Sequence, residues 1–308
     1  MRKQVETLVV GLVVALLVGS VTVWSLIASA LPVFAAPAAS TSRYMKTTDH
    51  NTLTSEGCQQ TNESGVVVLA FGQPWFDGTN YGTTIFGSNT FRSIADIEAA
   101  VKEWLNGYWV CGGSGVVDIA IGTSNYHGYT NYGHGQAWAQ MVNRIENWIV
   151  TPPSWGSRER VRGANDIELD WNSVSNSRAW IQGFSDARGV YYDTGDAAGC
   201  PPYGGCDNGW TLEDVWYKSW GAPPAYALPE IYNTDGSMAQ EWYQVSLYGY
   251  THHNGAVPIL ATLTQWAAAG HCCTNQPAQG WQQMYDALNR DSRTASYIPY
   301  STDITWAN

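Results

Sequence analysis

The sequence contains few charged residues and very few lysines. Among its 308 residues there are 15 Lys+Arg and 26 Asp+Glu, which gives a formal net charge of -11 at pH 7. Charged residues make up 13% of the chain, about half of their share in an ordinary globular protein. A protein that follows a phosphate backbone needs a basic surface, so we expect no nucleic-acid partner.

Several motifs that carry well-known chemistry are missing. No G-x-G-x-x-G turn follows a strand-like run and no G-x-x-x-x-G-K loop occurs, so the sequence gives little support for a dinucleotide or P-loop site. The absence of G-x-S-x-G argues against a serine hydrolase. Because the sequence also lacks H-E-x-x-H and C-x-x-C spacings, we expect neither a metal ion nor an organic cofactor.

There is only one long apolar run, so a protein with several membrane spans is excluded. The run covers residues 8–30 and follows the positive residues Arg2 and Lys3. Val33 and Ala35 have the small-residue spacing of a cleavage site, which predicts a signal peptide cut after Ala35. The run is also long enough to span a bilayer, and an uncleaved anchor is therefore the alternative.

Both interpretations of residues 1–35 export the rest of the chain, so we predict a secreted protein, or one anchored to a membrane and facing outside. A membrane contact is expected only through this segment, if it is uncleaved. Residues 36–54 are rich in Ala, Ser and Thr, a composition typical of a linker. The remaining residues, 55–308, are long enough for a single large domain.

Cysteine usage agrees with export, because an even number of cysteines beyond a signal segment is typical of disulfides. We predict two pairs, Cys58 with Cys111 and Cys200 with Cys206. Cys272 and Cys273 then pair with each other, or each finds another partner.

Strand-like and helix-like patterns alternate along the exported region. Short apolar runs predict strands at 65–72, 115–123, 165–171, 189–193, 225–232 and 257–263, with a last one within 297–306. Helical spacing of apolar residues predicts helices at 93–106, 136–150, 177–188, 211–220, 237–250 and 276–289. This alternation predicts an α/β fold with parallel strands, and its length favours a (β/α)8-type TIM barrel, either complete or irregular.

The clearest candidate site is the acidic alternation in segment 165–171. On a strand, Asp166, Glu168 and Asp170 would share one face, opposite an apolar face. Three like charges in a column are costly unless they face water, share protons or meet a cation. We therefore interpret them as functional, with Glu168 as the acid whose pKa is raised by crowding; a solvated acidic face is the alternative.

Other acids lie near predicted strand ends, where barrel enzymes carry their catalytic groups. Glycoside hydrolysis needs two carboxyl groups, and we expect Glu168 to work with Glu230 or Asp170. Asp118 and Asp193 join Asp166 as supporting acids, although a lone Asp within an apolar strand is more often structural.

The 40 aromatic residues are 13% of the chain, and flat rings with polar tips suit the faces of sugars. The candidate substrate-binding residues follow predicted strands and are Trp75, Tyr126, Tyr129, Gln265 and Trp266. The alternative is that such aromatics only cover the ends of the barrel.

Segment 166–172, Asp-Ile-Glu-Leu-Asp-Trp-Asn, resembles the acidic strand of chitinase-type barrel glycosidases, D-G-x-D-x-D-W-E. The core of the motif matches at residues 169–171, and its middle aspartate falls at Glu168. The family's catalytic glutamate falls at Asn172. The resemblance implies a barrel of the glycosidase-like superfamily, in which either the acid is a different residue or the protein belongs with the non-catalytic, glycan-binding members.

These observations predict an exported protein that binds a polysaccharide or cell-wall glycan and hydrolyses it with paired carboxyl groups. One alternative is a lectin-like module with the same barrel and no turnover. A second alternative is a surface-anchored domain whose acids only stabilise the fold.

Overall fold

The computed structural model describes residues 35–150, 156–222 and 225–307. The predicted export segment, 1–35, lies outside this part of the chain except for Ala35. No helix among the described residues is long and apolar enough to cross a membrane.

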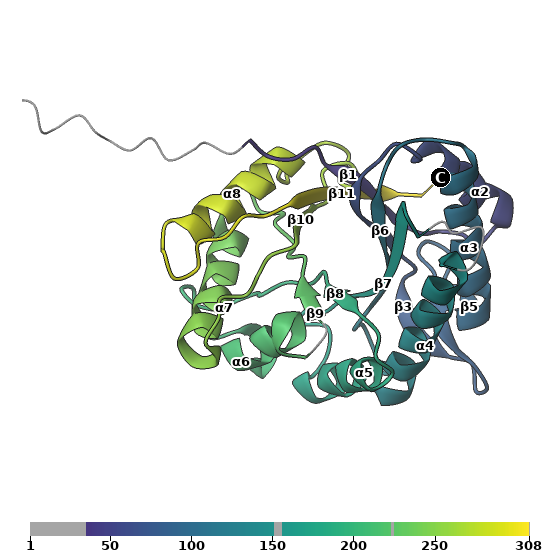
Figure 1. The fold of residues 1–308 in the computed structure, drawn as a ribbon. Helices are drawn as coiled ribbons and strands as arrows, with labels where there is room; N and C mark the ends of the chain where they lie inside the picture. The colour runs from purple at the N-terminus through teal and green to yellow at the C-terminus, as the bar shows by residue number, and fades with distance from the viewer. Residues whose placement is uncertain (1–34, 151–155, 223–224, 308) are drawn as a thin grey trace, which may run out of the picture. The chain divides into compact units, whose positions relative to one another are not determined.

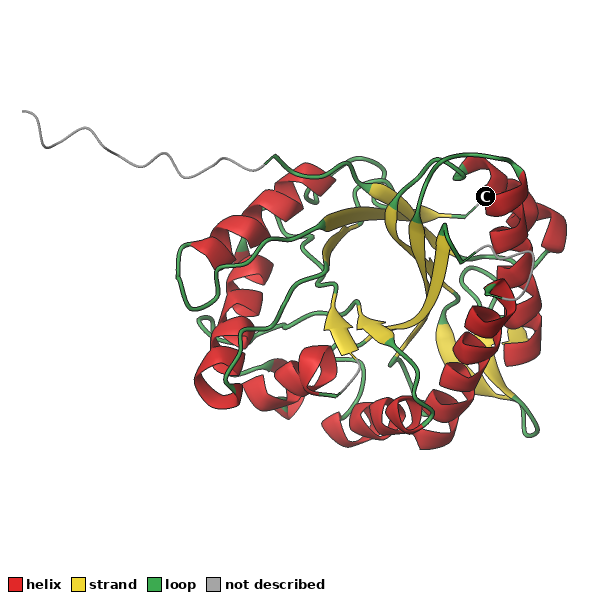
Figure 2. Ribbon diagram, in the orientation of Figure 1, coloured by secondary structure: helices red, strands yellow, loops and turns green. Residues whose placement is uncertain are grey.

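In the described part of the chain, eight parallel strands form a barrel (Figures 1 and 2). Their order around it is β10 (Ala261–Thr264), β11 (Tyr300–Trp306), β1 (Ser40–Tyr44), β2 (Gly65–Ala70), β6 (Val117–Ser124), β7 (Glu159–Asp166), β8 (Tyr191–Asp193) and β9 (Ala225–Ala227). Single bridges from Ala227 to Ile259 and from Glu230 to Leu263 nearly close it. The predicted α/β class is confirmed, and the topology fits a TIM-like barrel.

Helices connect successive strands and cover the outside of the barrel (Figure 2). They are α2 (His50–Gln59), α3 (Ile94–Val110), α4 (Tyr132–Ile149), α5 (Val174–Asp186), α6 (Leu212–Trp216), α7 (Ser237–His253) and α8 (Pro277–Asn289). A π-helical turn, Tyr217–Gly221, continues α6. A small antiparallel sheet that the sequence did not predict follows β2 and consists of β3 (Gln73–Phe76), β4 (Tyr81–Thr84) and β5 (Phe91–Ser93).

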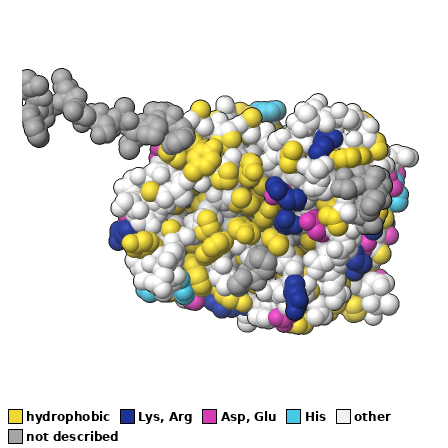
Figure 3. Space-filling model, in the orientation of Figure 1, with side chains coloured by type: hydrophobic (Ala, Val, Ile, Leu, Met, Phe, Trp, Pro, Cys, Tyr) yellow, Lys and Arg dark blue, Asp and Glu magenta, His cyan; other side chains and the backbone are white. Residues whose placement is uncertain are grey.

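The period of two on the strands builds two apolar layers. On β2, Val66 and Val68 belong to a small cluster that fills the barrel, whereas Val67 and Leu69 pack in the larger core under the helices. Trp104 of α3 is fully buried in that larger core. Charged side chains are scattered among uncharged and hydrophobic ones on the face drawn in Figure 3.

The prediction of a linker at 36–54 is wrong. This stretch forms β1, which pairs in parallel with β11 and β2, and it begins α2. Ser42 lies inside the barrel, where its hydroxyl contacts the Thr302 hydroxyl at 2.7 Å and accepts a hydrogen bond from the Val68 amide. The Ser and Thr residues that suggest a linker are therefore small polar groups of a buried strand.

Both predicted disulfides, Cys58–Cys111 and Cys200–Cys206, are confirmed. Cys272 and Cys273 are exposed free thiols whose sulfur atoms lie 2.9 Å apart.

We expect Cys272 and Cys273 to be joined in a third disulfide when the protein is isolated without reductant. The two thiols are accessible and adjacent, and the other four cysteines are already paired. Alkylating the unfolded, unreduced protein and mapping its peptides should label no cysteine and recover a bridged Cys272–Cys273 peptide. Two labelled thiols would contradict the prediction, and so would disulfide-linked dimers that disappear on Cys272→Ser.

Candidate active site

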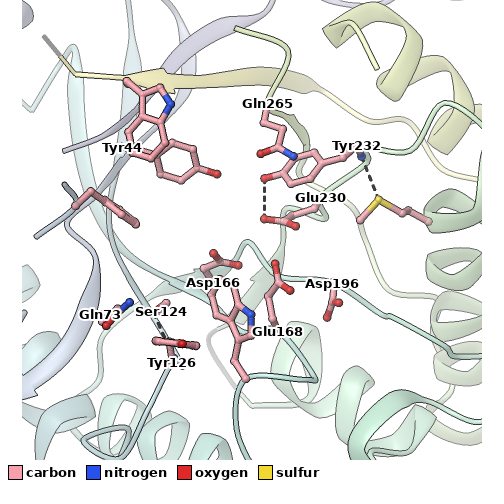
Figure 4. A pocket seen from close by; sticks show the side chains of 14 residues that line it. Tyr44, Gln73, Ser124, Tyr126, Asp166, Glu168, Asp196, Glu230, Tyr232 and Gln265 are labelled. Atoms are coloured by element: carbon pink, nitrogen blue, oxygen red, sulfur yellow. Dashed lines mark hydrogen bonds between the residues drawn. The ribbon is translucent and has the colours of Figure 1, made fainter. Parts of the chain in front are cut away.

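A cleft of about 570 Å³ lies at the carboxyl ends of the barrel strands (Figure 4). Strand ends and the residues just after them supply much of its lining: Tyr44, Gln73, Ser124, Asp166, Asp196, Glu230, Gln265 and Trp306. In barrels of this type the carboxyl ends of the strands carry the functional groups. The position of this cleft therefore makes it the candidate active site.

Three carboxyl groups meet inside the cleft. One oxygen from each of Asp166, Glu168 and Glu230 lies within 4.8 Å of the other two. Glu230 is only 4% exposed, and the hydroxyl of Tyr232 donates a hydrogen bond of 2.7 Å to it. Asp196 also lines the cleft (Figure 4).

This crowding changes which carboxyl groups hold protons. Burial, followed by the charge of Asp196, raises the pKa of Glu168 from its ordinary 4.5 to about 7. Burial and the neighbouring carboxylates raise the pKa of Asp166 and of Glu230 well above their ordinary values. The Tyr232 hydroxyl works in the other direction on Glu230, because its hydrogen bond favours the ionised form. The site therefore keeps protons near neutral pH.

The acidic segment is not the strand that the alternation predicted, because β7 ends at Asp166. Beyond Asp166, the backbone of the segment forms hydrogen bonds with side chains instead of with a neighbouring strand. Asn125 accepts from the Glu168 amide and donates to the Glu168 carbonyl, Lys218 donates to the Ile167 carbonyl, and the Leu169 amide donates to Asp196. Since these groups occupy the donors and acceptors that a neighbouring strand would use, the segment leaves the sheet and places Glu168 in the cleft.

Asp170 and Asn172 do not line the cleft. Asp170 is exposed on a turn. Of the three acids predicted to share a face, only Asp166 and Glu168 therefore line the cleft. Asn172 donates hydrogen bonds of 2.8 Å and 2.7 Å to the carbonyls of Asn125 and His127. Asn172 therefore holds a loop in place, and the departure from the chitinase-type motif at this position does not remove an acid from the cleft.

Behind the cleft lies a buried ion pair that the sequence analysis missed. The Lys218 ammonium is 2.9 Å from Asp193, and both side chains are fully buried. Lys218 favours the ionised forms of Asp193, Glu168 and Asp196. Asp193 thus supports the site through Lys218 rather than by lining the cleft. A lysine next to apolar residues, in a chain with four lysines, is the signal that could have identified it.

Asp118 is not near the cleft. It is the second residue of β6, at the amino end of the barrel, where Arg160 forms an ion pair with it and the Tyr192 hydroxyl donates to it at 3.1 Å. These contacts favour the structural alternative for Asp118.

Some of the candidate aromatic positions line the cleft. Tyr126 and Gln265 do, as does Trp171, whose ring meets that of Tyr126 edge to face at 5.5 Å. Trp75 and Tyr129 lie outside the lining and contact each other with ring centroids 5.0 Å apart. Trp266 also lies outside the lining and packs toward His271.

A second aromatic group, which the sequence analysis did not identify, forms another part of the cleft wall. Tyr44, Phe86 and Trp306 line the cleft, and their ring centroids are 4.9–5.9 Å apart. They come from β1, the loop after β4 and the end of β11. Only the closure of the barrel brings these three distant segments together.

The three clustered carboxyl groups are also hard oxygen donors of the kind that Ca²⁺ or Mg²⁺ binds. The absence of a metal thus stays a prediction from the sequence.

A scan against protein-family models and a search of curated proteins found no match to this chain.

Proposed function

We propose that this protein is an exported glycoside hydrolase that acts on a polysaccharide or cell-wall glycan. The observation that carries the proposal is the pair Glu168 and Glu230, whose carboxyl oxygens lie within 4.8 Å at the carboxyl end of the barrel. Paired carboxyl groups on either side of a glycosidic bond are the usual requirement for its hydrolysis. The two disulfides suit an oxidising compartment, in keeping with export.

Glu168 is the proposed acid and Glu230 the proposed nucleophile. With a pKa of about 7, Glu168 holds a proton in mildly acidic solution and donates it to the leaving glycosidic oxygen. The three crowded carboxyl groups share protons, and the reactive form is the one in which Glu168 holds a proton and Glu230 is ionised. The hydrogen bond from the Tyr232 hydroxyl favours this ionised Glu230, which attacks the anomeric carbon as the glycosidic bond breaks. This step leaves the sugar covalently bound to Glu230. Water then attacks the anomeric carbon of this intermediate, gives a proton to the ionised Glu168 and releases the sugar from Glu230.

The cleft walls suit a sugar. The aromatic group Tyr44, Phe86 and Trp306 and the pair Tyr126 and Trp171 both line it, and such rings pack against the C–H faces of pyranoses. Gln73 and Gln265 add amide groups for sugar hydroxyls (Figure 4). Apolar walls with a few polar groups are typical of small-molecule sites.

The test is product release from a panel of polysaccharides that includes chitin and peptidoglycan, with the oxidised mature protein. We expect turnover with retention of anomeric configuration, observed by NMR. The carboxyl separation is closer to the about 5–5.5 Å of retaining enzymes than to the about 6.5–9.5 Å of inverting ones. Inversion would overturn the role of Glu230 as nucleophile. Binding without any turnover would favour the lectin-like alternative, and activity abolished by a chelator would favour a metal at the three acids.

A further inference from the structure

Beyond the cleft, a second set of aromatic side chains lies on the small sheet and on the loop after β6. Trp75 of β3 is 38% exposed, and its ring packs against that of Tyr129. Phe76, the next residue of β3, also approaches Tyr129, with ring centroids 6.3 Å apart. We call Trp75 and Tyr129 the outer aromatic pair. Trp75 is thus more than one third exposed while the contact with Tyr129 restricts its ring, so part of the indole is accessible to a ligand.

The outer aromatic pair is continuous with the cleft through two separate chain segments. Gln73 lines the cleft, and Trp75 lies two residues further along the same strand, so both side chains point to the same side of β3. Tyr126 lines the cleft, and Tyr129 follows three residues later in the same loop. Both segments leave the cleft and meet again where Trp75 contacts Tyr129.

We propose that the outer aromatic pair is a binding platform for sugar residues beyond those in the cleft, and that the substrate is therefore a glycan polymer bound along its length. This inference rests on the proposed function for its substrate class. A ligand confined to the cleft would not reach Trp75, whereas a chain of several sugars would pass from Tyr126 to the pair. Stacking on aromatic rings suits a polymer because each sugar unit offers a similar apolar face.

The local structure keeps the platform rigid. β3 pairs with β4 over all of its residues, Gln73 to Phe76. The turn that follows is fixed by Asp77, which accepts hydrogen bonds from the amides of Thr79 and Asn80. A ring held on a paired strand loses little conformational freedom when a sugar stacks on it.

The experiment compares catalytic efficiency on long and short oligosaccharides cut from the polymer that the wild-type protein hydrolyses. We expect Trp75→Ala to reduce the ratio of kcat/KM for long to short substrates by about tenfold, because one stacking contact is lost. Trp75→Phe keeps a flat ring and should restore most of the ratio. An unchanged ratio in a folded Trp75→Ala protein, as judged by circular dichroism, would overturn the platform.

The matched control is Tyr250→Ala. Tyr250 is 46% exposed in the last turn of α7, which runs from the carboxyl end of β9 to the amino end of β10, so it lies at the opposite end of the barrel. Its substitution should leave the ratio unchanged.

Affinity electrophoresis in gels containing the polymer separates this inference from the proposed function. Retardation that is lost in Trp75→Ala supports the platform even if no hydrolysis is found. Hydrolysis with unchanged retardation and an unchanged ratio would leave the proposed function standing and remove the platform.

Discussion

Replacing Glu168 with Gln is expected to lower kcat on the hydrolysed glycan by about 10²–10⁴-fold, the usual contribution of a general acid. Glutamine keeps the size and shape of the side chain but cannot transfer a proton to the leaving oxygen. The matched control is Asp170→Asn, which removes a carboxyl group two residues away that is exposed and outside the cleft. Initial rates of both variants should differ sharply, and equal losses would contradict the assignment of Glu168.

The pH profile gives an independent readout of the same side chain. Because the pKa of Glu168 is about 7 and the proposed mechanism uses its protonated form, we expect kcat/KM of the wild-type protein to fall above about pH 7. The effect on stability has a definite sign. Between pH 4.5 and 7 the folded state binds more protons at Glu168 than the unfolded state does, so the free energy of unfolding decreases as pH rises.

Glu168→Gln removes the free-energy cost of ionising this buried carboxyl group. Its Tm should exceed that of the wild-type protein at pH 8 by more than at pH 4, as measured by calorimetry at matched ionic strength. The same gain in Tm at both pH values would show that the ionisation of Glu168 is not the cause.

The largest expected effect on stability comes from Lys218. Changing it to Met leaves Asp193 buried without its cation and removes the donor to the Ile167 carbonyl, and we expect a loss of about 3–5 kcal/mol in the free energy of unfolding. Urea denaturation measures this loss. Adding Asp193→Asn to Lys218→Met should recover part of it, because the double variant no longer buries the Asp193 carboxylate without its cation.

The control for Lys218 is Lys102→Met on α3. Lys102 pairs with Glu98 at 2.8 Å, but its side chain is 30% exposed, so its loss should cost less than about 1 kcal/mol. If Lys218→Met were as mild as Lys102→Met, the buried ion pair would not be what holds the segment around Ile167.

Much of the architecture could be predicted from local sequence patterns. The apolar runs and helical stripes predicted the alternation of strands and helices, because the periods of two and 3.6 are set by the backbone itself. The even number of cysteines predicted disulfides, and the two pairs chosen among the 15 connectivities that six cysteines allow are confirmed. Asp166 and Glu168 were identified because like charges along one face of a strand are costly. Glu230 was identified because it lies at a predicted strand end, and the structure places all three in one cleft.

Other features were hidden from the sequence because they depend on distant partners. β1 was mistaken for a linker, since the hydrogen-bond partners of Ser42 are Val68 and Thr302, which lie 26 and 260 residues away. Asp196 and Lys218 belong to the site through contacts with the segment that follows β7, and no local pattern marks those contacts.

The sequence by itself determined the alternation of most strands and helices and the presence of acids near strand ends, because each depends on neighbouring residues or on spacing. The tertiary structure alone decided that Asp118 lies at one end of the barrel and Glu168 at the other, and that Asp170 faces solvent. The reason is physical. Alternation along a strand says which side chains share a face, but the strand's end and the direction of the chain beyond it depend on which distant groups bind its backbone.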